Sequence, residues 1–260
     1  MFNYYELLKQ FISTDFKLRY KNSYLGIIWI ILKPLATFAV IYLIWSNIFK
    51  MDADYKMGLL MGIMIMNMFS EGVLNGLTSL MSKAGVILKI NFSREVVVIS
   101  AVTISLIDFF INMIVFAIFS LSTPVHPTFI GLLLFLMAIV SVFLLVLGLS
   151  FFSSIIYIRL RDIHNLTIVI LQLIFWMTPI YYQLEMLPLN LQRYIKLNPL
   201  TLIVTYARKG MINGATVRGE DFLQLGMVFL ISIILLPLQW YIFFHELSNG
   251  SFLNFVHPLA

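Results

Sequence analysis

The chain contains no cysteine, and charged residues make up only 11 % of its 260 positions. The missing cysteines exclude disulfides, thiolate metal ligands and a cysteine nucleophile. The four histidines are far apart along the chain and lack the spacing of zinc ligands. We therefore assign no catalytic, cofactor-binding or metal-ligating residue to the sequence.

Three catalytic motifs are also missing from the sequence. It has no G-x-x-x-x-G-K-[ST] loop to hold nucleotide phosphates, no HExxH and no GxSxG. Asp52-Ala53-Asp54 matches the D-x-D of nucleotide-sugar glycosyltransferases. This three-residue match lies on the side of the membrane expected to face away from cytoplasmic sugar nucleotides. The sequence is more typical of a conduit than of a catalyst.

What the chain has in excess is apolar residues, which fill 61 % of its positions. Soluble domains are roughly half apolar and a quarter charged, and a chain this short has too little interior to bury the excess. A transmembrane helix needs about 20 mainly apolar residues. Six blocks meet that length, and we expect an all-α membrane protein with one domain and six transmembrane helices: Tyr24–Phe49, Met57–Leu80, Val96–Leu121, Phe129–Tyr157, Leu166–Tyr182 and Phe222–Phe244.

The orientation follows from the basic residues in the connections between the blocks. Nine lie before the first block and in the second and fourth connections, which places both termini in the cytoplasm. Seven lie on the other side, five of them in the long connection before the last block. The net charge of +5 suits contact with anionic lipid, and because the basic residues are scattered we expect no nucleic acid partner.

Two segments outside these blocks also read as helical. Within residues 1–22, apolar residues recur at helical spacing from Leu7 to Phe16, which predicts an amphipathic helix lying in the membrane interface. The connection at 183–221 holds two apolar stretches, Leu187–Leu197 and Leu200–Ile212. We expect two short re-entrant helices there, because backbone at membrane depth must pack on protein or line a cavity.

Three formal charges fall inside the blocks: Lys33, Glu71 and Asp108. Each costs about 2.5–3.5 kcal/mol on the insertion scale if it faces lipid at mid-membrane. Lys33 is expected to extend toward the cytoplasmic surface. Two polar stripes surround the acids: Asn67, Glu71 and Asn75 on one block, and Ser105, Asp108 and Asn112 on the next. The stripes fit either a hydrated route or hydrogen bonding within a static bundle.

Aromatic side chains gather near the expected outer ends of the first and fifth blocks. They are Tyr42, Trp45, Trp176, Tyr181 and Tyr182. An aromatic belt at the membrane interface explains them, and so does a path on which sugar rings stack.

Five short motifs occur in a fixed order over nearly the whole chain. They are Leu25-Gly26-Ile27-Ile28-Trp29 followed by Lys33-Pro34-Leu35, then Leu88-Lys-Ile-Asn-Phe-Ser-Arg-Glu95, Arg161-Asp162-Ile163, Thr178-Pro179-Ile180-Tyr181 and Asn198-Pro199-Leu200-Thr201. In this order the motifs resemble those of ABC-2 type permeases that export polysaccharides, such as O-antigen, teichoic acid and capsule transporters. Ser93 stands where that family has proline.

The resemblance implies a transmembrane subunit in a bacterial inner membrane. It implies a second copy of the chain, two cytoplasmic ABC ATPase subunits that bind ATP and Mg²⁺, and an undecaprenyl-diphosphate-linked O-antigen as cargo. Teichoic acid, capsule polysaccharide or a small drug are alternative cargoes. A membrane glycosyltransferase, or a gradient-driven carrier that uses Glu71 and Asp108, is the alternative from another class.

The resemblance also implies roles for particular residues. A coupling helix that docks on the ATPase would include Lys83, Lys89, Phe92, Arg94 and Glu95. The interfacial helix would meet the lipid pyrophosphate through Lys17, Arg19 and Lys21. The channel or glycan path would include Tyr42, Trp45, Glu71, Trp176, Tyr181 and Tyr182. An outer gate would include Pro188, Asn198 and Pro199.

Overall fold

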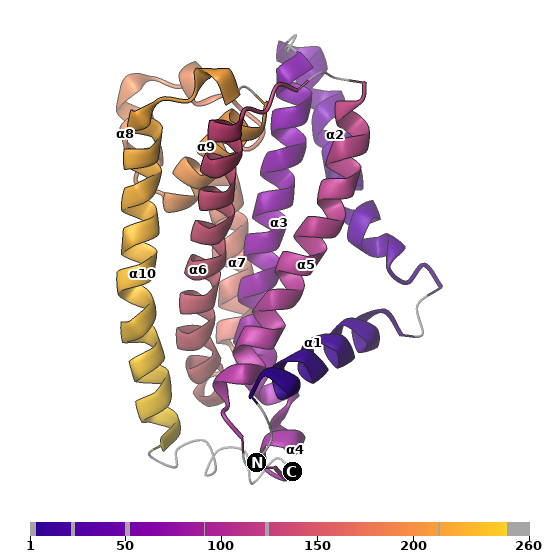
Figure 1. Ribbon diagram of the computed structural model, residues 1–260, viewed down its shortest axis with the longest axis vertical. Helices are drawn as coiled ribbons and strands as arrows, with labels where there is room; N and C mark the ends of the chain where they lie inside the picture. The colour runs from indigo at the N-terminus through magenta and orange to yellow at the C-terminus, as the bar shows by residue number, and fades with distance from the viewer. Residues whose placement is uncertain are drawn as a thin grey trace.

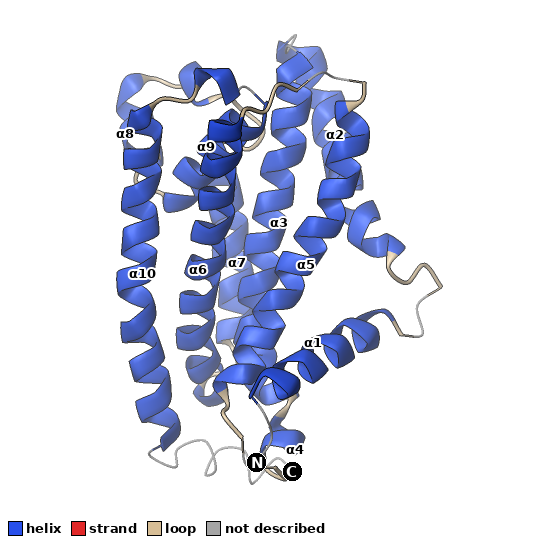
Figure 2. Ribbon diagram, in the orientation of Figure 1, coloured by secondary structure: helices blue, strands red, loops and turns tan. Residues whose placement is uncertain are grey.

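The computed structural model describes residues 4–21, 24–49, 53–90, 92–122, 125–212 and 214–248, and within these ranges the chain is helical with no β-strand (Figure 2). The α-helices are α1 Tyr4–Tyr20, α2 Ile28–Phe49, α3 Ala53–Ser82, α4 Ala84–Ile87, α5 Glu95–Ser120, α6 Phe129–Arg159, α7 Ile163–Met177, α8 Leu189–Ile195, α9 Pro199–Ile212 and α10 Gly219–Ser248. Two short 3₁₀ turns, Leu184–Met186 and Gly214–Thr216, flank α8 and α9. The all-α prediction is confirmed.

Among the described residues, five helices are long and apolar enough to cross a membrane: α2, α3, α5, α6 and α10. The block expected at Leu166–Tyr182 forms α7, which has only 15 residues and ends at Met177. It ends there because Thr178 precedes Pro179, which lacks an N–H and disfavours helical backbone at the residue before it. Thr178 is extended, with φ −88° and ψ 133°. The predicted sixth crossing is therefore shorter than the sequence pattern indicated.

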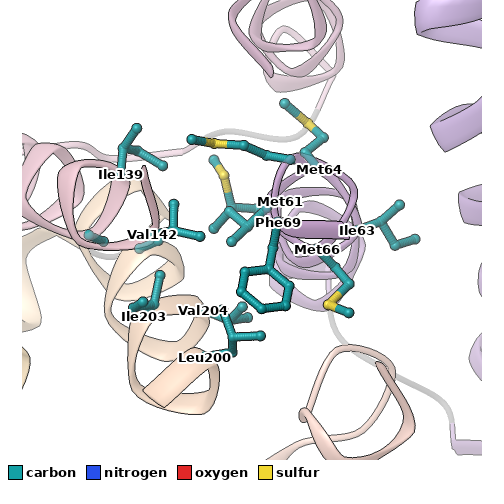
Figure 3. Close-up of a cluster of buried hydrophobic side chains, with 14 of the residues drawn as sticks. Met61, Ile63, Met64, Met66, Phe69, Ile139, Val142, Leu200, Ile203 and Val204 are labelled. Atoms are coloured by element: carbon teal, nitrogen blue, oxygen red, sulfur yellow. The ribbon is translucent and has the colours of Figure 1, made fainter. Parts of the chain in front are cut away.

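α3 lies at the centre of the helical bundle and packs along α5 and α6 (Figure 1). In its first half, residues 57–66 are apolar on every side, so that Met57, Met61 and Ile65 are fully buried. Figure 3 shows Met61 and Phe69 of this helix facing α6 and α9. Methionine fills irregular gaps well, which suits a helix that has neighbours on several sides.

α9 is held against α6 by a close approach of two glycines. A Cβ on Gly210 would lie 2.4 Å from the carbonyl oxygen of Gly131, and a Cβ on Gly131 would lie 2.3 Å from that of Gly210. Small residues at such crossings let the backbones of membrane helices approach closely. The second stretch expected in the long connection is thus a helix packed on protein.

Gly210→Ala is expected to destabilise the bundle by about 1–3 kcal/mol, because the new methyl group meets backbone that cannot rotate away. Gly226→Ala is the matched control on α10, where a Cβ would meet only the end of Met137 at 3.5 Å. Thermal unfolding of both variants in nanodiscs checks this. Equal melting temperatures would show that the helices separate at little cost.

The two ends of the bundle carry different elements. In Figure 1, α1 slopes across the lower end near α4, whereas α8 lies at the upper end. α1 packs mainly on α5, and α2 follows it after a turn in which Gly26 has a left-handed φ of 46°. Glycine adopts that backbone conformation without the strain that a side chain brings. The helix expected in residues 1–22 is confirmed as a helix.

Candidate functional site

Four charged side chains from four helices form one ionic network, which we call the ion quartet: Arg19, Lys33, Glu71 and Asp108. Arg19 of α1 donates to Asp108 of α5 at 2.7 Å and lies 3.8 Å from Glu71 of α3. Lys33 of α2 donates to Glu71 at 2.8 Å. Removing these charges from water is costly, and pairing them offsets the cost.

The ion quartet supplies partners that the sequence did not reveal. The expected extension of Lys33 toward the cytoplasmic surface stays a prediction: its side chain is 67 % exposed, and its ammonium group binds Glu71. Arg19 was expected at the membrane interface, yet it reaches the side chain of Asp108, which is only 9 % exposed. Lys17 and Lys21 are exposed, and of the three expected pyrophosphate ligands Arg19 is the one that lines the cavity beside Asp108.

The ion quartet lines a cavity of about 430 Å³ between α1, α2, α3 and α5, which we call the polar cavity. Asn67 and Asn75 of α3 and Ser105 and Asn112 of α5 also line it. The two polar stripes read from the sequence therefore face one common space. The cavity agrees with a hydrated route, and the ion quartet supplies hydrogen bonds between helices, so both interpretations stay predictions.

A second cavity, of about 640 Å³, lies between α1, α3, α4 and the start of α5, and we call it the amphipathic cavity. Part of its wall is polar, with Thr78, Ser79 and Ser82 of α3. The rest is largely apolar and includes Leu18 and Ile104. The amphipathic cavity thus has the mixed lining that suits a molecule with both a polar and an apolar part.

The segment expected to dock on an ATPase packs partly on α1. Lys83 forms an ion pair with Asp15, and both side chains are only 16 % exposed. The Lys83 ammonium also lies 4.5 Å from the centroid of the Phe11 ring, and the Phe11 and Phe92 rings are 5.5 Å apart. Two of the five expected docking residues therefore serve a contact within the chain.

The other three expected docking residues differ in exposure. Lys89 is exposed, whereas Arg94 and Glu95 are half-buried. Glu95 accepts a hydrogen bond from the Trp240 indole of α10 at 3.0 Å, and burial together with the Glu95 charge raises the pKa of Tyr4 on α1. Glu95 thus connects the start of α5 to its neighbours, and Lys89 presents its charge outward.

Four of the five expected outer aromatic residues form one cluster. The Tyr181 ring is central, with centroids 5.0 Å from Trp45, 5.1 Å from Trp176 and 5.0 Å from Tyr182. Tyr42 instead stacks on Phe38 at 5.5 Å. An aromatic belt at the membrane interface needs only separate rings, whereas these four rings contact one another in one compact cluster.

The expected gate residues join two of the sequence motifs. Asn198 donates to the Thr178 hydroxyl at 3.0 Å and accepts from the Leu200 amide at 3.1 Å. Pro199 is the first residue of α9, where its missing N–H is not needed, and Pro188 directly precedes α8. The T-P-I-Y and N-P-L-T segments therefore form one hydrogen-bonded unit.

Arg208 is the residue that sequence reasoning missed. Its guanidinium donates to the carbonyl oxygens of Gly58 at 2.7 Å, Pro179 at 2.7 Å and Ile180 at 2.6 Å. A Cβ on Gly62 would lie 2.3 Å from the same guanidinium, so glycine makes room for it. Arg208 was counted among the loop charges, although its place inside the apolar stretch Leu200–Ile212 was a signal of burial.

The described residues contain no group of three or more histidine, aspartate or glutamate side chains placed to hold a metal ion. Asp52, the first acid of the D-x-D match, lies outside the described residues. Asp54, the second acid of the match, belongs to no such group within the described ranges.

Comparison with known proteins agrees with this geometry. Residues 6–212 match the family model described as ABC-2 type transporter. The chain is 26 % identical over 211 residues to an O-antigen export system permease protein RfbA of Klebsiella pneumoniae, an alignment that covers 81 % of this chain and 82 % of the relative. It is 23 % identical over 208 residues to the protein of the same name from Myxococcus xanthus, covering 79 % and 80 %. The described chain is an all-helical bundle with several membrane-length helices, and the family model matches most of its length. The chain therefore belongs to the ABC-2 type transporter family.

Proposed function

We propose that this chain is the membrane subunit of an ATP-driven exporter that moves undecaprenyl-diphosphate-linked O-antigen across the bacterial inner membrane. The observation that carries the proposal is the polar cavity, which holds an ion quartet among helices of membrane length. Charges at that depth mark routes for polar cargo. The relatives named as O-antigen export permeases supply the cargo class.

The working unit in this proposal is a dimer of the chain with two cytoplasmic ABC ATPase subunits, which bind ATP and Mg²⁺. In this topology α1 and α4 lie on the cytoplasmic side, and both termini are assigned to the cytoplasm. α7 makes the sixth crossing: its 15 residues extend about 22 Å, and the Thr178–Tyr182 segment continues toward the outer surface. α8 and α9 form the outer gate beside the aromatic cluster.

The proposal is tested in cells of the host. Deleting the gene should remove O-antigen from the surface and leave lipid-linked glycan on the cytoplasmic face, as measured by glycan extraction and surface labelling. The purified chain in liposomes should move no glycan without its ATPase and nucleotide. Transport by the chain alone would overturn the proposal in favour of a gradient-driven carrier, and teichoic acid or capsule accumulation would change the cargo.

Lys89→Glu is expected to weaken association with the ATPase by about tenfold while leaving the fold intact, because an exposed charge contributes to docking and not to packing. Lys196→Glu is the matched control, since Lys196 is exposed beside α8 at the opposite end. Co-purification of the ATPase with each variant measures the effect. Equal recovery with both variants would remove Lys89 from the docking surface.

A further inference from the structure

The polar cavity and the amphipathic cavity share two wall residues, Arg19 and Asn75. Arg19 comes from α1, and Asn75 comes from α3, which packs along α5. The bond from Arg19 to Asp108 therefore lies between the two cavities. Arg19 and Asn75 are therefore the side chains that stand between the two cavities.

Two polar atoms at or beside the shared wall lack partners within the described part of the chain: Asn75 lines both cavities, and Asp108 lines the polar cavity. The Asp108 Oδ1 atom and the Asn75 Nδ2 atom are buried, and neither has a hydrogen-bond partner among the described residues. Buried polar groups are otherwise almost always paired, because leaving one unpaired costs its desolvation free energy. One atom is an acceptor on a carboxylate and the other is an amide donor. A ligand that carries hydroxyl groups satisfies both kinds at once.

The charges favour a ligand that is anionic at one point and neutral elsewhere. The two cations and two carboxylates of the ion quartet cancel, so the closed arrangement has no net charge. Lys33 is 67 % exposed and keeps donors beyond the one it gives to Glu71. A phosphate can take Arg19 and Lys33 as partners. A fully anionic ligand would be repelled by Asp108, whereas a sugar hydroxyl donates to it.

We propose that Arg19 is a removable partition, and that the two cavities together form the binding site for a lipid-linked glycosyl phosphate. The apolar wall of the amphipathic cavity takes the adjoining lipid chain, and the phosphate binds Arg19 and Lys33. Asp108 and Asn75, uncovered when Arg19 moves, bind hydroxyl groups of the first sugar. This assignment rests on the proposed function and names the part of the cargo that the chain reads.

The partition is tested by cysteine labelling, since the chain has no cysteine of its own. Asn75→Cys in nanodiscs should react slowly with a water-soluble methanethiosulfonate. Adding Arg19→Ala with Asp108→Asn removes the ion pair without leaving a buried charge, and should raise the rate at least tenfold. Ser153→Cys on α6 is the control, because its hydroxyl is also buried and unpaired but lines neither cavity. Equal rates with and without the ion pair would overturn the partition.

The sugar assignment is tested with two probes, undecaprenyl diphosphate and the same lipid bearing one N-acetylglucosamine. The unmodified chain in nanodiscs should bind the sugar-bearing probe at least fivefold more tightly. Asn75→Ala should abolish that preference and still fold, because the lost amide nitrogen has no partner to lose. Asp221→Asn, which alters a buried aspartate paired with Lys209, should keep the preference.

The outcomes separate this inference from the proposed function. Equal affinity for both probes, or a preference that survives Asn75→Ala, overturns the sugar site even if export in cells depends on the chain. Failure of both probes to bind, together with normal surface glycan after gene deletion, overturns the proposed function as well.

Discussion

Arg208→Met is expected to destabilise the protein by about 3 kcal/mol or more, because three backbone carbonyls lose a charged donor and the methionine supplies none. The three acceptors belong to α3 and to the segment after α7, so α9 loses its hydrogen bonds from Arg208 to both. Arg208→Lys should be nearly as harmful, since a single ammonium group lacks the planar geometry that reaches three acceptors. Thermal unfolding in nanodiscs and recovery by size-exclusion chromatography measure the loss.

Lys209→Met is the neighbouring control for this prediction. Lys209 makes one ion pair with the buried Asp221, which keeps its hydrogen bond from the Arg218 amide. Because that carboxylate is not left without a partner, removal of Lys209 should cost about 1–2 kcal/mol. If the two methionine variants had equal melting temperatures, the three hydrogen bonds of Arg208 would contribute no more to stability than the single ion pair of Lys209.

Arg19→Ala is expected to cost about 3–5 kcal/mol, because it leaves Asp108 as a buried charge without its main partner. The double variant Arg19→Ala with Asp108→Asn should recover most of that loss, since no buried charge remains. A double-mutant cycle on unfolding free energies measures the coupling. Additive effects would mean that the two residues are not energetically paired.

Lys17→Ala provides the comparison on the same helix. Lys17 is exposed, so its replacement should stay within about 0.5 kcal/mol of the parent. A loss of stability as large as that of Arg19→Ala would show that α1 is held by its overall positive charge and not by the contact with Asp108.

Hydropathy predicted the membrane helices well where an apolar stretch of the sequence forms one continuous helix. Five blocks formed helices of membrane length, with ends shifted by a few residues. The block that ended early was α7, where Pro179 stops the helix although the residues after it remain apolar. The hydropathy of a stretch of sequence indicates which residues avoid water. It does not indicate at which residue the backbone hydrogen bonds of the helix end.

The sequence did not indicate which charged side chains contact one another. The stripes of Glu71 and Asp108 suggested either a hydrated route or hydrogen bonding between helices, and the structure places both stripes on one cavity. That Arg19 completes this space depends on how α1 lies against α5, which no local pattern encodes. Likewise, basic residues of the long connection look alike in a count of charges, and only the fold separates buried Arg208 from exposed Lys196.

The contacts of α1 have a consequence for how the binding of cargo and the binding of the ATPase are coupled in export. Phe11, Asp15 and Arg19 recur every fourth residue, so they share one face of the helix. The first two touch Phe92 and Lys83 beside the docking segment, and the third holds Asp108. A rigid helix attached at both places links them thermodynamically, and such linkage acts equally in both directions. Cargo that draws Arg19 away would alter ATPase affinity by the same factor by which the ATPase alters cargo affinity.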